Sequence, residues 1–240
     1  MTPAPANNTP NATNATNATG IQLRAAHAHY GPLEALHGIT LTAPAAALTV
    51  LLGPNGSGRT TALRALAGTV RLTAGSVLWD GADVTRHSAH ARAAAGLRLV
   101  PDRQAVFAGL TVAENLRLAA GDVAPALDAY PELRPLLPRR AGTLSGGEQR
   151  MLAVSRALHA PARVVLLDEP TQGMAPPVAA RTYALLRALD ACVVLAEQRL
   201  PPDLRRAATK GAAVFVYELG RGAVVFRGEA TEIPNGTPSE

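Results

Sequence analysis

The sequence predicts an α/β fold in which a mainly parallel sheet, with antiparallel strands at its edge, carries an inserted helical lobe. Short apolar runs at 48–52, 164–167 and 193–196 have the length and composition of strands buried on both faces, which is typical of parallel sheets. Strand-like and helix-like segments alternate from Ile21 onward, which favours this class over a repeat or an all-β fold. Residues 103–160 interrupt the alternation with a mainly helical segment that prolines divide.

The expected elements follow in order along the chain. Residues 1–20, with Asn-Ala-Thr repeated three times, and residues 233–240 offer little to pack and are predicted to be disordered tails on either side of one domain at 21–232. In that domain we expect strands at 21–28, 38–43, 48–52, 76–79, 97–100, 164–167 and 193–196, helices at 60–66 and near 178–189, a helical lobe at about 103–160, and a closing hairpin at 213–226.

Composition narrows the class of protein. The 240 residues are 48% hydrophobic and 17% charged, which supports a packed core. We find no apolar run near the roughly 18 residues of a membrane span and no signal segment, so we expect a soluble, cytoplasmic protein. The net charge of +5 comes from scattered arginines and one lysine, with 3% aromatic residues, which favours a compositional bias over nucleic-acid binding. The sole cysteine, Cys192, is expected to fill the core.

A glycine-rich loop follows the first buried run. Its glycines permit a tight turn with inward N–H groups, and the helix after it adds a positive end, so the loop suits a phosphate. Thr60 stands where a hydroxyl holds Mg²⁺, but Arg59 replaces the lysine that precedes this hydroxyl in P-loops. The planar fork of arginine differs in shape from an ammonium, which leaves hydrolysis open between normal, slow and absent. The candidate binding residues are Gly53, Pro54, Asn55, Gly56, Ser57, Gly58, Arg59, Thr60 and Thr61.

Two further motifs carry chemistry. Asp168 and Glu169 end a buried run, at the edge where open α/β sheets place their ligands. Before them, residues 144–150 read Leu-Ser-Gly-Gly-Glu-Gln-Arg, a glycine-rich turn that leads into a helix and suits a phosphate. Ser145, Gly146 and Gly147 are its candidate contacts.

In this order the three motifs resemble the ATPase domain of ABC transporters, which has a P-loop NTPase core with an antiparallel β edge subdomain and an inserted helical subdomain. The resemblance implies that the chain binds ATP and Mg²⁺, that Asp168 orients the ion through water, and that Glu169 is the general base. It also implies a head-to-tail dimer with a second ABC ATPase subunit. In that dimer, residues 145–147 of one subunit close on the γ-phosphate held by the partner.

The same resemblance gives three other residues a role. Tyr30 stands where the family places an aromatic ring that stacks on adenine. Asp102 takes the place of a glutamine that links the γ-phosphate and Mg²⁺ to the helical lobe, so it is a candidate catalytic and metal-site residue. Gln198 takes the place of the histidine that contacts the γ-phosphate, where its amide can still hydrogen-bond. None of the six histidines receives a motif role.

Softer local phrases resemble the second ATPase subunit of branched-chain (hydrophobic) amino-acid importers. They include Tyr30-Gly31, Gly173-Met174-Ala175-Pro176 and Ala196-Glu197-Gln198. This implies transmembrane permease subunits as partners, a solute-binding protein as an indirect partner, and a peripheral position at the cytoplasmic face of the cell membrane. A groove around 107–112 is expected to receive the permease; alternatively, Phe107 and Leu110 only fill the core of the lobe.

Two other functions stay open. In the first, Arg59 makes the chain a nucleotide-binding but hydrolysis-impaired regulatory half of a heterodimer. The second, a soluble ABC protein that acts on nucleic acid or ribosomes, is disfavoured. Such proteins usually carry two ATPase domains or a long coiled-coil insertion, whereas this sequence has one set of motifs.

Overall fold

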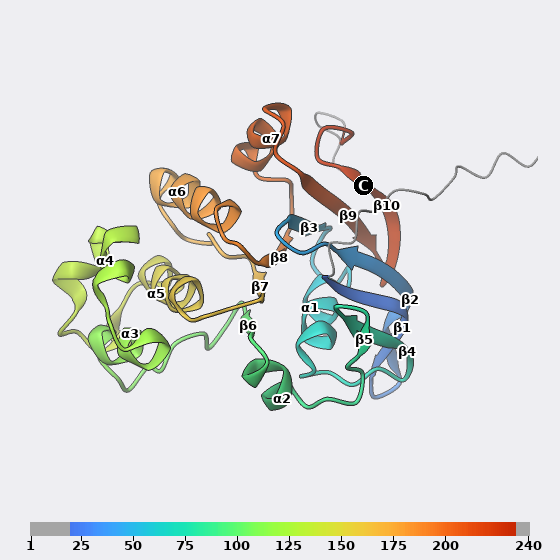
Figure 1. Ribbon diagram of the computed structural model, residues 1–240, viewed down its shortest axis with the longest axis horizontal. Helices are drawn as coiled ribbons and strands as arrows, with labels where there is room; N and C mark the ends of the chain where they lie inside the picture. Colours follow the sequence, from blue (N-terminus) through green and yellow to red (C-terminus); the bar gives the residue numbers. More distant parts are fainter. Residues whose placement is uncertain (1–19, 234–240) are drawn as a thin grey trace, which may run out of the picture.

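The computed structural model describes residues 20–233 (Figure 1). Apart from Gly20 and Ile233, the predicted tails at 1–20 and 233–240 lie outside the described residues. The centre of the fold is a six-stranded sheet in the order β10-β9-β3-β8-β7-β6. Its parallel strands are β3 (Leu48–Leu52), β6 (Leu97–Val100), β7 (Val164–Asp168), β8 (Cys192–Glu197) and β9 (Val214–Gly220), and β10 (Ala223–Glu229) pairs antiparallel with β9.

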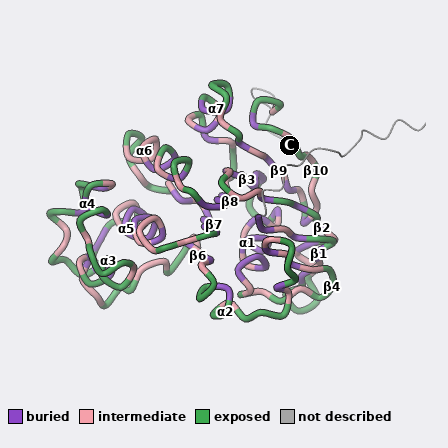
Figure 2. Tube along the Cα trace, viewed as in Figure 1, coloured by how far each residue is buried: buried purple, intermediate pink, exposed green. Residues whose placement is uncertain are grey.

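The central strands separate two hydrophobic cores. Along β8, Val193 and Leu195 join a core with the helices, whereas Cys192 and Val194 face a second core on the other side of the sheet. This alternation follows from the two-residue period of a strand, and it explains why both faces had to be apolar. Figure 2 shows the result as continuous burial through β7 and β8.

The second core lies between the central sheet and a four-stranded antiparallel sheet in the order β2-β1-β4-β5. That sheet consists of β1 (Ile21–Tyr30), β2 (Leu33–Ala43), β4 (Ala74–Trp79) and β5 (Ala82–Asp83). Helix α1 (Arg59–Ala67) contacts strands of both sheets. The phosphate loop and the start of α1 are therefore held by both sheets.

The inserted segment forms a helical lobe beside the central sheet, and Figure 1 shows it at the left. Its longest helix, α5, begins with a capping box in which Ser145 accepts from the backbone N–H of Glu148 and Glu148 returns to the N–H of Ser145. α3 and α4 pack on α5. The lobe contains α3 (Val112–Ala120), α4 (Ala124–Ala129), the 3₁₀ helices η1 (Pro131–Leu136) and η2 (Ala141–Thr143), and α5 (Gly146–His159).

Helix α6 (Pro176–Arg187) is close to the expected helix at 178–189, but two other helices were not predicted. They are α2 (Ala89–Ala94) and α7 (Pro202–Thr209). α2 offers no periodic large apolar residue; instead, the buried guanidinium of Arg92 anchors it. Arg92 donates to the carbonyls of Ala65 and Leu66 at 2.8 and 2.7 Å, where α1 ends and the negative end of its dipole favours a cation. Among the described residues, no helix combines the length and apolar character needed to cross a membrane.

Candidate functional site

The phosphate loop runs from the end of β3 to the start of α1. Gly58 directly precedes α1 with φ 103°, a left-handed conformation that favours glycine. Because glycine has no side chain, Gly58 does not cap the first N–H groups of α1. A Cβ on Gly53 would lie 2.3 Å from the carbonyl oxygen of Leu219. The loop is thus pressed against β9, and its backbone path requires glycine at both ends.

Arg59 begins α1, and only 5% of the residue is exposed. Its Nη2 lies 3.4 Å from Glu169 Oε1 and 3.4 Å from Asn55 Oδ1. Its Nη1 is buried and has no hydrogen-bond partner in residues 20–233, and the same holds for the Ser57 hydroxyl. Buried polar groups are normally hydrogen-bonded, so these two orphaned groups fit an anionic ligand that the loop encloses.

Asp168 and Thr60 face each other from β7 and α1. The Thr60 hydroxyl donates to Asp168 Oδ2 at 2.7 Å. Burial raises the pKa of Asp168 above its ordinary value, the hydrogen bond from Thr60 opposes this shift, and the neighbouring Asp102 adds to it. A buried carboxyl group beside other acids and a hydroxyl fits a hard cation such as Mg²⁺. No cluster of three or more His, Cys, Asp or Glu side chains that could hold a metal ion occurs in the part of the chain that is described.

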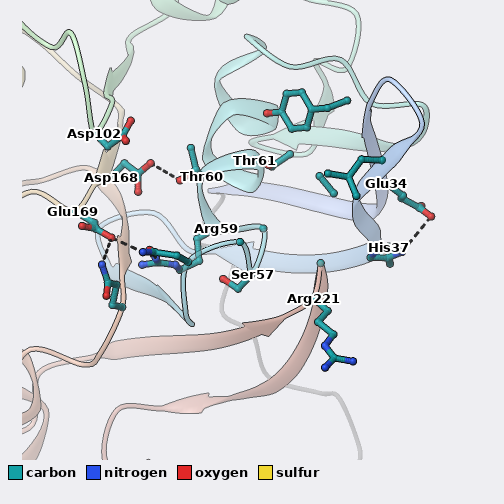
Figure 3. Close-up of a pocket in the computed structure, with 18 of the residues that line it drawn as sticks. Glu34, His37, Ser57, Arg59, Thr60, Thr61, Asp102, Asp168, Glu169 and Arg221 are labelled. Carbon is teal, nitrogen blue, oxygen red and sulfur yellow. Dashed lines mark hydrogen bonds and ion pairs between the residues drawn. The ribbon is translucent and has the colours of Figure 1, made fainter. Parts of the chain in front are cut away.

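Glu169 follows β7 in a backbone conformation that is rare for a residue with a side chain, with φ 47°. Its N–H donates to the carbonyl of Ala196 at 2.9 Å. Two amides hold its carboxylate: Gln198 Nε2 lies 3.0 Å from Oε1, and Gln172 Nε2 lies 3.0 Å from Oε2. With Arg59 on the same Oε1, three side chains hold the carboxylate. Figure 3 marks the contact between Arg59 and Glu169.

These groups line one cavity of about 690 Å³ (Figure 3). Tyr30, the last residue of β1 and 43% exposed, lines the cavity. The carboxylates of Asp102, Asp168 and Glu169 lie together on one side of it (Figure 3). Of the residues predicted from the sequence, the cavity brings together Tyr30, Asn55, Gly56, Ser57, Gly58, Arg59, Thr60, Thr61, Asp102, Asp168, Glu169 and Gln198.

Other predicted residues do not line this cavity. Gly53 and Pro54 belong to the loop but shape its backbone instead. Ser145, Gly146 and Gly147 lie at the start of α5, outside the cavity. A Cβ on Gly147 would lie 2.2 Å from the carbonyl oxygen of Gly173, so this glycine is required by packing within the chain.

The cavity also contains residues that the sequence analysis missed. His37 and Glu34 come from β2, and the Glu34 carboxylate lies 3.2 Å from His37 Nδ1 and 2.6 Å from His27 Nδ1. The turn of the β9–β10 hairpin adds Gly222, which accepts from the N–H of His37 and donates to the carbonyl of Ser57, at 2.8 and 2.9 Å. No motif signals these contacts, because they depend on how distant strands meet. The missed residues are Leu33, Glu34, Ala35, His37, Arg103, Gln172, Arg221 and Gly222.

The helical lobe is tied to the cavity through Arg150 of α5. Its guanidinium is buried and donates to the carbonyls of Pro101 and Asp102, at 2.6 and 2.5 Å. In the loop before α3, Phe107 is 52% exposed, and the Arg156 guanidinium lies 4.7 Å from its ring centroid. Phe107 therefore does not fill the core of the lobe.

The chain resembles known proteins over most of its length. The family model described as "ABC transporter" matches residues 36–172. A probable branched-chain amino acid transport ATP-binding protein, LivF of Archaeoglobus fulgidus, is 36% identical over 86% of this chain and 91% of its own length. The high-affinity branched-chain amino acid transport ATP-binding protein BraG of Pseudomonas aeruginosa is 31% identical over 80% of this chain and 86% of its own.

Solved structures confirm the predicted fold class. The ADP conformation of an ATP-binding cassette of an ABC transporter has a TM-score of 0.70 at 22% identity, covering 88% of this chain and 91% of that one. A post-hydrolysis cassette bound to ADP and Pi has a TM-score of 0.75 at 19% identity, with coverage of 89% and 100%. At these identities the likeness establishes the architecture alone.

Proposed function

Because the chain belongs to the ABC transporter family, we propose that it is the ATP-binding and ATP-hydrolysing subunit of an importer of branched-chain or other amino acids. The observation that carries this proposal is the single cavity in which a phosphate loop, the Thr60–Asp168 pair and Glu169 face one another. The choice of solute rests on the two branched-chain relatives, since no residue of this subunit is expected to touch the solute.

The residues divide the work as follows. The N–H groups of the loop and the free Nη1 of Arg59 bind the phosphates, and Tyr30 stacks on the base. Thr60 and Asp168 hold Mg²⁺, which when bound neutralises charge on the phosphate oxygens. Glu169 accepts a proton from the attacking water, and the amide of Gln198 keeps the carboxylate directed into the site.

The position of the glycine-rich turn at the start of α5 supports a head-to-tail dimer. Ser145–Gly147 lie outside the cavity of their own chain, although a glycine-rich turn at a helix start suits a phosphate. If a second ABC ATPase subunit faces this one in reverse orientation, the glycine-rich turn of each subunit lies against the phosphate loop of the other. We propose that ATP at the two shared sites stabilises the closed dimer and that hydrolysis releases it.

The lobe surface around Phe107 is the proposed contact with the transmembrane permease subunits. Asn115 fixes the loop that carries this ring, accepting from the N–H of Phe107 at 2.9 Å and donating to its carbonyl at 3.0 Å. A rigid, exposed aromatic side chain is a common anchor in protein interfaces. Through the permease the subunit is held at the cytoplasmic face of the membrane, and a solute-binding protein delivers the solute to the permease.

A second candidate function is favoured by the contact between Arg59 and Glu169. An ion pair between the phosphate-loop cation and the general base competes with both of their tasks. In this alternative the chain binds ATP but hydrolyses it poorly, and it acts as the regulatory half of a heterodimer.

Steady-state ATP turnover of the purified chain, alone and with its candidate ATPase partner, separates the two functions. We expect Mg²⁺-dependent turnover that Glu169→Gln abolishes while ATP binding persists. A wild type that binds ATP without turnover, and gains turnover as Arg59→Lys, would establish the regulatory alternative. Loss of ATP binding altogether would refute both.

A further inference from the structure

A buried tyrosine that does not line the cavity takes no part in the functions described above. Tyr183 lies on α6 and is 5% exposed. Its hydroxyl donates to Glu197 Oε1 at 2.6 Å and lies 2.8 Å from the Thr171 hydroxyl. A phenol has one proton, so once that proton goes to Glu197 the Tyr183 oxygen accepts from Thr171. The two hydrogen bonds join three separate segments of the chain.

The two residues that Tyr183 holds directly precede the two amides that orient Glu169. Thr171 is followed by Gln172, whose Nε2 lies 3.0 Å from Glu169 Oε2. Glu197 is followed by Gln198, whose Nε2 lies 3.0 Å from Glu169 Oε1. Gln172 and Gln198 thus hold both oxygens of the Glu169 carboxylate. The residues that precede them, Thr171 and Glu197, both hydrogen-bond to the Tyr183 hydroxyl.

Glu169 requires such support because its backbone is strained. A φ of 47° at a residue with a side chain is sparsely populated and persists where the surroundings enforce it. We propose that Tyr183 is a positioning residue for Glu169, which fixes Gln172 and Gln198 through Thr171 and Glu197 and so sets the direction of the carboxylate. Tyr183 touches neither nucleotide nor water in this scheme.

Burial strengthens the arrangement. Desolvation raises the pKa of the Tyr183 hydroxyl, so the phenol keeps the proton that it donates. Desolvation also raises the pKa of Glu197 to about 7, with the Tyr183 hydrogen bond opposing the shift and the Glu169 charge adding to it. In a partly buried site, water replaces a lost protein hydrogen bond only at a cost in free energy. Removing the Tyr183 oxygen therefore loosens both Thr171 and Glu197.

The test, which rests on the proposed function, compares Tyr183→Phe with a matched variant, Tyr130→Phe. Tyr130 is also buried, and its hydroxyl lies 2.9 Å from the hydroxyl of Thr182, which precedes Tyr183 on α6. Within the described chain, the Tyr130 hydroxyl makes no hydrogen bond with Glu169 or with the two amides that hold it. In the full-length chain we expect Tyr183→Phe to lower kcat about tenfold or more while the KM for ATP stays within about twofold, as for a misplaced catalytic group. Tyr130→Phe should leave both constants near the wild-type values.

Two further measurements keep the proposal falsifiable. Thr171→Val should resemble Tyr183→Phe, and Thr171→Ser, which restores a hydroxyl, should recover kcat; a loss of stability alone would not sort the variants in this way. Amide hydrogen exchange of peptides covering 169–173 and 196–199 should rise in Tyr183→Phe and not in Tyr130→Phe, whether or not the wild type turns over ATP. Unchanged exchange, or an unchanged kcat in an active wild type, would overturn the proposal. Absence of wild-type turnover would refute only the proposed hydrolysis.

Discussion

Replacing Arg59 by lysine tests the most unusual contact of the site. Arg59 Nη2 lies 3.4 Å from Glu169 Oε1, and the two side chains are 6% and 15% exposed. At that separation and an effective dielectric constant of about 20, the Coulomb attraction is about 5 kcal/mol. Desolvation of both groups offsets much of it, which leaves about 1–2 kcal/mol that holds the carboxylate against the phosphate loop. Lysine keeps the positive charge but has no second nitrogen to reach Glu169.

We therefore expect Arg59→Lys to raise kcat about tenfold, the rate equivalent of about 1.4 kcal/mol, while the Kd for ATP changes by less than about threefold. The assay is steady-state phosphate release together with calorimetric ATP binding. Arg64→Lys, the same exchange later in α1, is the control and should change neither value. A double-mutant cycle on the unfolding free energy of the nucleotide-free chain, with Arg59→Lys and Glu169→Gln, should give a coupling of about 1 kcal/mol. A lower kcat in Arg59→Lys, or no coupling, would refute the idea that Arg59 restrains the base.

Three further predictions concern packing, the metal and pH. Gly147→Ala should lower the unfolding free energy by about 1–3 kcal/mol in urea titrations, because its Cβ would lie 2.2 Å from a backbone oxygen, whereas Gly146→Ala, with open space around it, should not. Chelation of Mg²⁺ should weaken ATP binding in the wild type but have little effect on Thr60→Ala, and equal sensitivity in calorimetry would remove Thr60 from the ion site. The pKa of Glu197 is raised from 4.5 to about 7, so its contribution to stability is complete below about pH 4.5 and is lost as the pH rises through 7. Between pH 5 and 8 the unfolding free energy should therefore change less in Glu197→Gln than in the wild type, by at most about 3 kcal/mol. An equal change in both proteins would contradict the raised pKa of Glu197.

Local sequence determined the central strands and the loop between them. Leu48–Leu52 and Leu97–Val100 occupy the bounds predicted from the sequence, because strands of a parallel sheet consist mainly of apolar residues, here with Thr49 and Arg98 as the exceptions. The phosphate loop could also be predicted, because its glycines, its hydroxyls and the start of the following helix lie within nine consecutive residues. Helix α2 was not, because a buried arginine that reaches the end of α1 holds it in place of an apolar stripe.

The sequence by itself therefore determined the fold class and the family, and it predicted roles for Asp168, Glu169 and Thr60, because each of these depends on residues that are close together in the chain. Only the tertiary structure decided how the Glu169 carboxylate is held. Arg59, Gln172 and Gln198 meet at Glu169 from α1, the turn after β7 and the end of β8. The physical reason is that hydrogen bonds between such segments depend on strand order and helix packing, which no local pattern of residues specifies.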